Sequence, residues 1–238
     1  MMNHPIKLAE QSSQLLLAPS DVLAQIGAQD LQTLFSLGKT QRYPKGDFIF
    51  HAGSAGSHVY FLRQGRVKIY QLSPVGREVI LWFCFTGEMF GLAEVGRGEE
   101  RVVNAQACED SETLCIPKEQ FNAFLESHPK IALLIMHVLS CRLRVLGEVL
   151  VNLASDDVNT RLAKLILRLG ARYGKRVGTE IHLDIHLTHQ EMADMIGATR
   201  QTVTSALGHL KRQGILSMGN RRILIESEEL LNELTHAS

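Results

Sequence analysis

The stretch FGLAEVGRGEERVV, from Phe90 to Val103, combines residue types that bind phosphate groups. Its fourteen residues include three glycines and two arginines. Glycine lets the backbone approach an anion closely, and the guanidinium group of arginine supplies positive charge with a fork of hydrogen-bond donors. We therefore treat this stretch as a candidate cradle for an anionic ligand.

A second stretch, THQEMADMIGATRQTVTSALGHLKRQGIL (188–216), has the pattern of two short helices joined by a tight turn. Thr188 with Glu191 three residues later predicts a capping box, Gly197 permits the turn, and Thr199 can cap the second helix. The apolar residues expected on the inner side of that second helix are Val203, Ala206, Leu207 and Leu210. This arrangement fits a helix-turn-helix, whose second helix enters the major groove of DNA.

The side chains expected to face DNA are polar or basic. Arg200, Gln201 and Ser205 lie at the exposed start of the second helix, where arginine can recognise guanine and glutamine can recognise adenine. The further residues expected to contact DNA, several of them able to hold phosphates, are Thr188, His189, Gln190, Thr199, Thr202, Lys211, Arg221 and Arg222. The alternative is an ordinary helical hairpin. The following ILS and RRILI segments around MGN predict a wing, and they favour the helix-turn-helix.

The distribution of charge also favours a nucleic-acid partner. The formal net charge of the whole chain is zero. Residues 158–225 hold 11 Lys and Arg against 4 Asp and Glu, a balance of +7, whereas residues 1–157 sum to −3 and the tail 226–238 to −4. The neutral total therefore conceals a basic block around the predicted helix-turn-helix.

The part of the chain that must position the first candidate site reads as short strands. From about Gln41 to Cys115, segments such as HVYFLRQG, RVKIYQLSPVG and ETLCIP are rich in strand-forming residues and are punctuated by glycine. No helical segment separates them, so a sandwich or barrel is expected rather than a parallel sheet, and SPVG is a plausible hairpin connection.

A long helix is predicted next, between Pro129 and Ala154. Apolar residues recur there at alternating steps of four and three, which is the spacing of a coiled-coil seam. The seam consists of Met136, Leu139, Leu143, Leu146, Leu150 and Leu153. Ile131, Ile135 and Val138 are among the apolar residues off the seam, so the helix can contact its own barrel and a partner helix. Docking onto the sheet alone is the alternative. The polar cluster Ser155 to Asp157 predicts a hinge, with Ser155 or Asp156 as the cap of the next helix.

The sequence contains little that indicates membrane targeting, reactive cysteines or a metal site. No run approaches 18 apolar residues and the N-terminus lacks a signal-peptide pattern, so no membrane partner and a cytoplasmic location are expected. The four cysteines lack CxxC spacing, which favours buried free thiols over redox sensing or metal ligation. Alternation in EIHLDIHLTH puts His182, Asp184 and His186 on one strand face, which is either a metal site or, as we expect, a solvated face.

Together, these motifs resemble the cyclic-AMP receptor protein and fumarate and nitrate reduction regulator family (CRP/FNR). The resemblance covers about Gln41 to Ile225 and rests on KGDFIFHAGSAGSHVYFLRQGRVKIY, NLASDDVNTRLA and LTHQEMADMIGATRQTVTSAL. It implies an α+β fold with three parts: a jelly-roll, cyclic-nucleotide-binding-like sensor domain over 1–127, a dimerisation helix and hinge over 128–156, and a winged helix-turn-helix over 157–238. It also implies a homodimeric transcription regulator that binds a palindromic operator in double-stranded DNA, and not an enzyme.

In cyclic-AMP-binding members of that family, the opening stretch corresponds to the phosphate-binding cassette. This chain keeps Gly91 and Arg101, but has Leu92 where a glutamate is expected and Val102 where a hydroxyl residue is expected. The effector-binding positions implied by the resemblance are Gly91, Leu92, Ala93, Glu94, Arg101, Val102, Leu146 and Gly147. The missing hydrogen bonds are each worth about 1 kcal/mol, so tight cyclic-AMP binding is not expected, although Glu94 or Glu99 could replace the lost acid.

The effector is therefore unknown, and several alternatives stay open. These are a cyclic nucleotide after all, a small carboxylate such as 2-oxoglutarate paired with Arg101, a redox signal, and haem held by a histidine such as His51 or His58. A barrel metalloenzyme is a remote alternative, because those histidines lack His-x-His spacing. The resemblance further implies RNA polymerase as a partner, through the loop YGKRVGTE and the turn SPVGRE.

Overall fold

The computed structural model describes residues 26–95, 100–219 and 222–235. Contacts within the chain divide these residues into two compact units, one running to Leu143 and one beginning at Arg144. The division falls inside the longest helix, α4 (Pro129–Ser155). No helix in the described ranges is long and apolar enough to cross a membrane.

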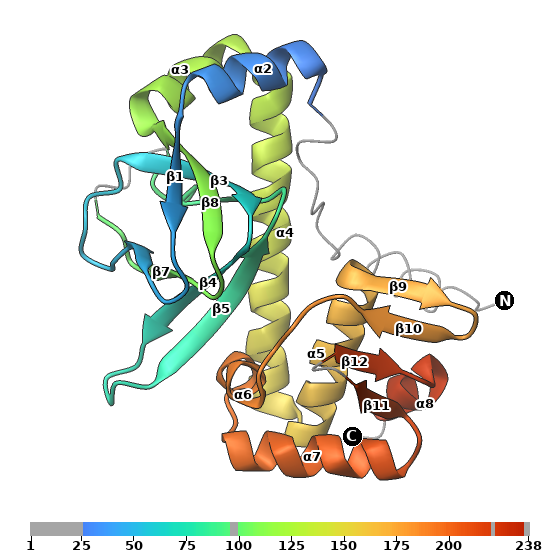
Figure 1. Ribbon diagram of the computed structural model, residues 1–238. Coiled ribbons are helices and arrows are strands. Elements are labelled where there is room, and N and C mark those ends of the chain that lie inside the picture. The colour runs from blue at the N-terminus through green and yellow to red at the C-terminus, as the bar shows by residue number, and fades with distance from the viewer. Residues whose placement is uncertain (1–25, 96–99, 220–221, 236–238) are drawn as a thin grey trace, which may run out of the picture. The chain divides into compact units, whose positions relative to one another are not determined.

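The first unit contains a β-barrel built from two antiparallel sheets (Figure 1). Its four-stranded sheets have the orders β1-β8-β3-β6 and β2-β7-β4-β5, which is the pattern of a jelly roll. The strands are β1 (Lys39–Tyr43), β2 (Phe48–Phe50), β3 (His58–Gln64), β4 (Arg66–Leu72), β5 (Glu78–Phe85), β6 (Met89–Phe90), β7 (Asn104–Ala107) and β8 (Ser111–Pro117). The predicted succession of short strands is confirmed, including the SPVG turn between β4 and β5.

Helices cover one end of this unit. Its helices α2 (Ala28–Ser36) and α3 (Lys118–Ser127) precede and follow the barrel strands. A cluster of buried side chains joins the barrel to these helices and to the first half of α4, where Ile131, Ile135 and Val138 are buried. The expectation that this face of the long helix packs on the barrel is therefore confirmed.

The opposite face of α4 keeps its apolar side chains exposed within the single chain. Five of the six predicted seam residues are exposed, and Leu146 is half-buried. The five are Met136, Leu139, Leu143, Leu150 and Leu153. Such a row of uncovered apolar side chains along a helix is typical of a surface that another helix covers.

The second unit combines a helix-turn-helix with a small four-stranded sheet, two strands of which precede the helix-turn-helix and two of which follow it. Its helices are α5 (Val158–Tyr173), α6 (His189–Ile196), α7 (Arg200–Arg212) and α8 (Glu228–Glu233). Its strands are β9 (Gly174–Val177), β10 (Glu180–Leu183), β11 (Leu216–Gly219) and β12 (Arg222–Ile225), paired in the order β11-β12-β10-β9. The predicted hairpin after the second helix is thus confirmed, with Gly219 paired to Arg222.

Candidate nucleic-acid interface and barrel site

The first helix of the helix-turn-helix begins as the sequence predicts. Thr188 Oγ1 accepts a hydrogen bond from the Glu191 backbone N–H at 3.1 Å, and Glu191 Oε2 accepts one from the Thr188 N–H at 2.7 Å. This reciprocal capping box satisfies two backbone donors at the start of α6. The helix ends at Gly197, whose φ of +65° lies in the left-handed region that favours glycine.

The second helix, α7, exposes the side chains predicted to face DNA. Thr199 caps it by accepting a hydrogen bond from the Thr202 N–H at 3.1 Å. Its inner face is buried as predicted, through Val203, Ala206, Leu207 and Leu210. Arg200, Gln201 and Ser205 are all exposed, and within the described residues none of the three side chains has a hydrogen-bond or ion-pair partner. They are therefore available to an external partner.

Several of the predicted phosphate-holding side chains are tied to neighbours. His189 Nδ1 lies 2.8 Å from Thr204 Oγ1, and the hydroxyls of Thr199 and Thr202 are 2.7 Å apart. Gln190 donates to the buried carboxylate of Asp194 at 2.9 Å. These contacts fix the polar edge at the start of both helices, which is where backbone N–H groups are free to meet phosphate. Lys211, on the exposed side of α7, is also uncovered.

The outer face of the small sheet is charged. Asp184 lies 2.8 Å from Lys175 Nζ and 3.1 Å from Arg222 Nη2, and the lysine contact is the main cause that lowers the pKa of this carboxyl group. His182 and Asp184 are exposed, and the alternation predicted for this strand is confirmed by the burial of Ile181. No group of three metal-ligating side chains forms within the described part of the chain. Arg221 lies outside the described residues.

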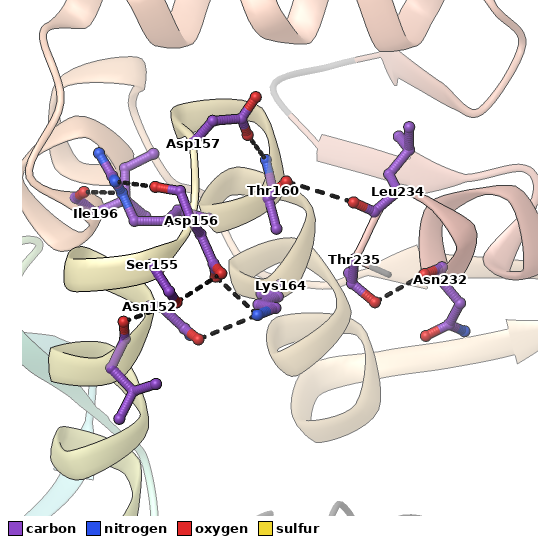
Figure 2. A network of polar contacts seen from close by, with 12 residues as sticks. Asn152, Ser155, Asp156, Asp157, Thr160, Lys164, Ile196, Asn232, Leu234 and Thr235 are labelled. Carbon is purple, nitrogen blue, oxygen red and sulfur yellow. Dashed lines mark hydrogen bonds and ion pairs between the residues drawn. The ribbon is translucent and has the colours of Figure 1, made fainter. Parts of the chain in front are cut away.

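The break between α4 and α5 is held by a polar network, shown in Figure 2. Lys164 Nζ contacts Asp156 Oδ2 at 2.7 Å and Asn152 Oδ1 at 3.1 Å. The Asp156 side chain is only 6% exposed, and the hydrogen bond from Lys164 is the main cause that lowers the pKa of its carboxyl group. The residue that follows α4 and the second turn of α5 are therefore joined by an ion pair whose carboxylate is buried and whose ammonium group is partly exposed.

The cap of α5 differs from the prediction. Asp157, and neither Ser155 nor Asp156, accepts the hydrogen bond from the Thr160 N–H, at 2.8 Å. The reason is that α4 continues through Ser155, while the Asp156 carboxylate is engaged by Lys164. The hydrogen bond from Thr160 lowers the pKa of the Asp157 carboxyl group.

Arg161 links this break to the helix-turn-helix. Its Nη1 donates to the Asp156 carbonyl at 2.7 Å, and its Nε donates to the carbonyl of Ile196, the last residue of α6, at 2.9 Å. Neither Arg161 nor Lys164 was predicted from the sequence to be a functional residue. The sequence feature that could have identified them is their spacing after Asp157, which places both on turns of α5 that can face back toward the break.

In the barrel, the structure brings together three of the predicted effector residues. Arg101 forms an ion pair with Glu94 and donates to the carbonyls of Gly91, at 3.2 Å, and His58. Both charged side chains are buried, at 1% and 5% exposure. Gly91 has a φ of +71°, and a Cβ there would lie 3.0 Å from Arg101 Nη1, so this position needs glycine.

The other predicted effector residues are more dispersed. Leu92 belongs to the apolar core and Ala93 is exposed. Val102 is 64% exposed, and its carbonyl accepts a hydrogen bond from Gln71. Leu146 and Gly147 belong to the other compact unit, and Glu99 lies outside the described residues. Of the histidines considered for haem, His51 stacks on Phe48 and His58 Nδ1 lies 2.9 Å from Ser57 Oγ.

Comparison with known proteins gives matches to both units. The family model for the cyclic nucleotide-binding domain matches residues 40–128, and the model for the Crp-like helix-turn-helix domain matches residues 160–234. The chain is 30% identical over 195 residues to the global nitrogen regulator of Synechocystis, covering 81% of this chain and 87% of that protein.

Two further matches agree with these. Over 189 residues the chain is 29% identical to a CRP-like cAMP-activated global transcriptional regulator of Mycobacterium tuberculosis, covering 79% of this chain and 84% of the regulator. A solved structure of a CooA mutant from Carboxydothermus hydrogenoformans aligns with a TM-score of 0.78 at 26% identity, over 90% of this chain and 95% of that one. The matched domains correspond to the barrel and to the unit that contains α6 and α7.

Proposed function

Since the chain belongs to the CRP/FNR family of transcriptional regulators, we propose that it works as a homodimer whose two α7 helices read a palindromic operator. The observation that carries this proposal is the exposure of Arg200, Gln201 and Ser205 at the start of a buried, well-capped helix. Arginine and glutamine supply bidentate contacts to guanine and adenine. The family relationship supports DNA binding and dimerisation, and the Mycobacterium tuberculosis relative is a transcriptional regulator by name.

Operator selection from random double-stranded DNA tests the reading of bases. The selected sequence is expected to be a palindrome, and Arg200→Ala should weaken binding to it by roughly 10- to 100-fold, the loss of one bidentate contact. Arg63→Ala is the matched control, because Arg63 is an exposed arginine on β3. If Arg200→Ala binds the selected operator as tightly as the control, recognition by α7 as described is wrong.

The proposed dimer contact is the exposed seam of α4. Leu143 and Leu150 are 72% and 69% exposed in the single chain, and Met136 is 61% exposed. Covering three such side chains with the same residues of a second copy removes apolar surface from water at about 25 cal/mol per Å². A two-fold axis through the seam would also place two recognition helices for the two halves of a palindrome.

Control of DNA binding is proposed to pass through the break between α4 and α5. In the second unit, Arg161 joins the Asp156 carbonyl to the end of α6, so a changed angle between α4 and α5 would also shift the helix-turn-helix. An effector in the barrel would then act by shifting the population of two arrangements of α4. Identical DNA affinity in every ligand state would contradict this and indicate a constitutive binder.

A contact with RNA polymerase is proposed at two exposed turns. One lies between β4 and β5, where Val75 is 88% exposed, and the other connects β9 to β10 at Gly178. Both turns connect paired strands, and neither is part of the predicted DNA-reading helix. Val75→Asp is expected to lower transcription in a purified system while operator affinity stays unchanged. Such a regulator would act in the cytoplasm, on the operator DNA.

A further inference from the structure

The barrel contains a buried cation that is already neutralised from within the chain. The guanidinium carbon of Arg101 lies 4.2 Å from the centre of the Phe50 ring and 5.9 Å from that of Tyr60, and the side chain is 1% exposed. Its Nη1 contacts the Glu94 carboxylate and also donates to the Gly91 carbonyl, while Nη2 donates to the His58 carbonyl. Within the described residues, the buried Nε has no hydrogen-bond partner.

The Glu94 side chain packs against the backbone of the connection between β2 and β3. Gly56 lies against Glu94 so closely that a Cβ on Gly56 would stand 2.7 Å from Glu94 Cβ. Arg101 is anchored to the same connection, because its N–H donates to the Ser54 carbonyl at 2.8 Å and its carbonyl accepts from the Gly53 N–H at 2.7 Å. The ion pair is therefore part of the packed barrel wall and not a contact between mobile surface side chains.

We propose that Glu94 is an internal ligand that occupies the anion position of Arg101 and thereby excludes anionic effectors from the wild-type barrel. This inference deepens the proposed function, on which it rests, because it concerns the effector site of the same regulator. Glu94 is in this sense the residue that determines specificity at the site.

The physical reason is competition for one cation. A phosphate or carboxylate entering the barrel would need the Nη1 edge that Glu94 holds, and it would bring a second negative charge beside a buried carboxylate in a region of low dielectric constant. Removing a single partner of a buried ion pair leaves an uncompensated charge, which is strongly unfavourable. Glu94 is therefore difficult to displace, and an effector of the wild-type protein is expected to be uncharged or cationic.

The same geometry predicts what the barrel would bind without the internal carboxylate. Glu94→Ala leaves Arg101 buried and unpaired, next to a space with the size of a short carboxylic acid. A small carboxylate that fills this space would restore the ion pair. We therefore expect acetate or propionate to bind the variant and not the wild-type chain.

The test is a rescue experiment on the full-length protein. Thermal unfolding of wild type, Glu94→Ala and Glu100→Ala is followed while sodium acetate or propionate replaces sodium chloride at constant ionic strength. Glu94→Ala should unfold at a lower temperature than wild type, and its transition should rise saturably with the carboxylate. Wild type and Glu100→Ala, which removes an exposed acid one residue from Arg101, should show no difference between the salts.

Two further arms complete the test. A double variant with Glu94→Ala and Arg101→Leu should show no rescue, because the cation is gone. Wild type should show no saturable heat with cyclic AMP or 2-oxoglutarate in calorimetry. The inference is overturned by binding of either compound to wild type, or by a folded Glu94→Ala that ignores carboxylates. If Glu94→Ala does not fold in sodium chloride, its refolding yield in sodium acetate or propionate is compared with the yield in chloride. A yield that the carboxylate raises supports the inference, and a yield that it leaves unchanged overturns it. Operator binding is measured separately, so that failed DNA recognition with intact rescue would contradict only the proposed function.

Discussion

Leu153, the last leucine of the α4 seam, lies directly against Gly197, the turn residue of the helix-turn-helix. A Cβ added to Gly197 would stand 3.0 Å from Leu153 Cδ2, although Leu153 itself remains 45% exposed. Both residues belong to the second compact unit. One side chain therefore borders both the proposed dimer seam and the turn that sets the start of α7.

Gly197→Ala is expected to destabilise this unit. The alanine would have to keep a φ of +65°, which costs a non-glycine residue about 1 to 2 kcal/mol, and its methyl group would press on Leu153. Urea unfolding should show the loss in the free energy of unfolding. Gly208→Ala is the matched control: it lies inside α7 with its nearest neighbour at 3.5 Å, so it should be neutral or stabilising by about 1 kcal/mol. Equal losses for the two substitutions would contradict the inference that Gly197 is required by its left-handed backbone and its proximity to Leu153.

Asp156→Asn should lower stability in a pH-dependent manner. The hydrogen bond from Lys164 lowers the pKa of the Asp156 carboxyl group in the folded state. The ion pair's contribution is therefore fully present above the unfolded-state value of about 3.9 and is lost as the pH falls through the lower folded-state value. At pH 7 the variant should lose about 1 kcal/mol in the free energy of unfolding, the scale of a partly exposed pair.

The comparison between pH values is the decisive part of that experiment. Denaturant titrations at pH 7 and near pH 3 should show the difference between wild type and Asp156→Asn shrinking in acid. Glu229→Gln is the matched control, since it also replaces a carboxylate by an amide, but at an exposed residue in the first turn of α8. A difference that is as large at low pH as at neutral pH would show that Asp156 stabilises the break by packing and not by its charge.

The features that could be predicted from sequence are those set by local spacing. The capping box of Thr188 and Glu191 depends on residues three apart, and the buried and exposed faces of α4 follow from the period of its apolar residues. The cap at Asp157 was missed, because it depends on how far α4 continues before the break and on which aspartate Lys164 engages.

Long-range contacts escaped prediction for a related reason. The contact of Arg161 with Ile196 joins residues 35 apart in the chain, and Gly56 confines Glu94 only after the barrel closes. Sequence spacing identified Glu94 as an acid near Arg101, but it could not show that the two are buried together. Whether that arginine faces a ligand or an internal partner depends on packing and not on residue type.

Leu143→Asp is expected to disrupt the homodimer. Leu143 lies in the middle of the seam and is 72% exposed in the single chain, so an aspartate there would be harmless to the monomer but would be buried, beside its own symmetry mate, in a dimer. Light scattering after size exclusion should show half the wild-type mass, or a dissociation constant raised at least about 100-fold. Leu230→Asp, on the exposed side of α8, should stay dimeric. If Leu143→Asp is dimeric too, the seam is not the contact.

Gln201→Glu is expected to change the base that α7 prefers, and it separates base reading from general attraction to DNA. Gln201 is exposed and has no side-chain partner within the described residues, so the substitution should not disturb the fold. Glutamine offers both a donor and an acceptor and suits adenine, whereas glutamate only accepts and suits the amino group of cytosine. Operator selection with the variant should therefore shift one position of each half-site, and affinity for the wild-type operator should fall by roughly 10- to 100-fold.

Lys211→Ala should instead weaken binding to every sequence alike and reduce the salt dependence by about one ion. If Gln201→Glu lowers affinity uniformly, with no change in the selected sequence, then Gln201 faces the DNA backbone and another side chain of α7 reads that base.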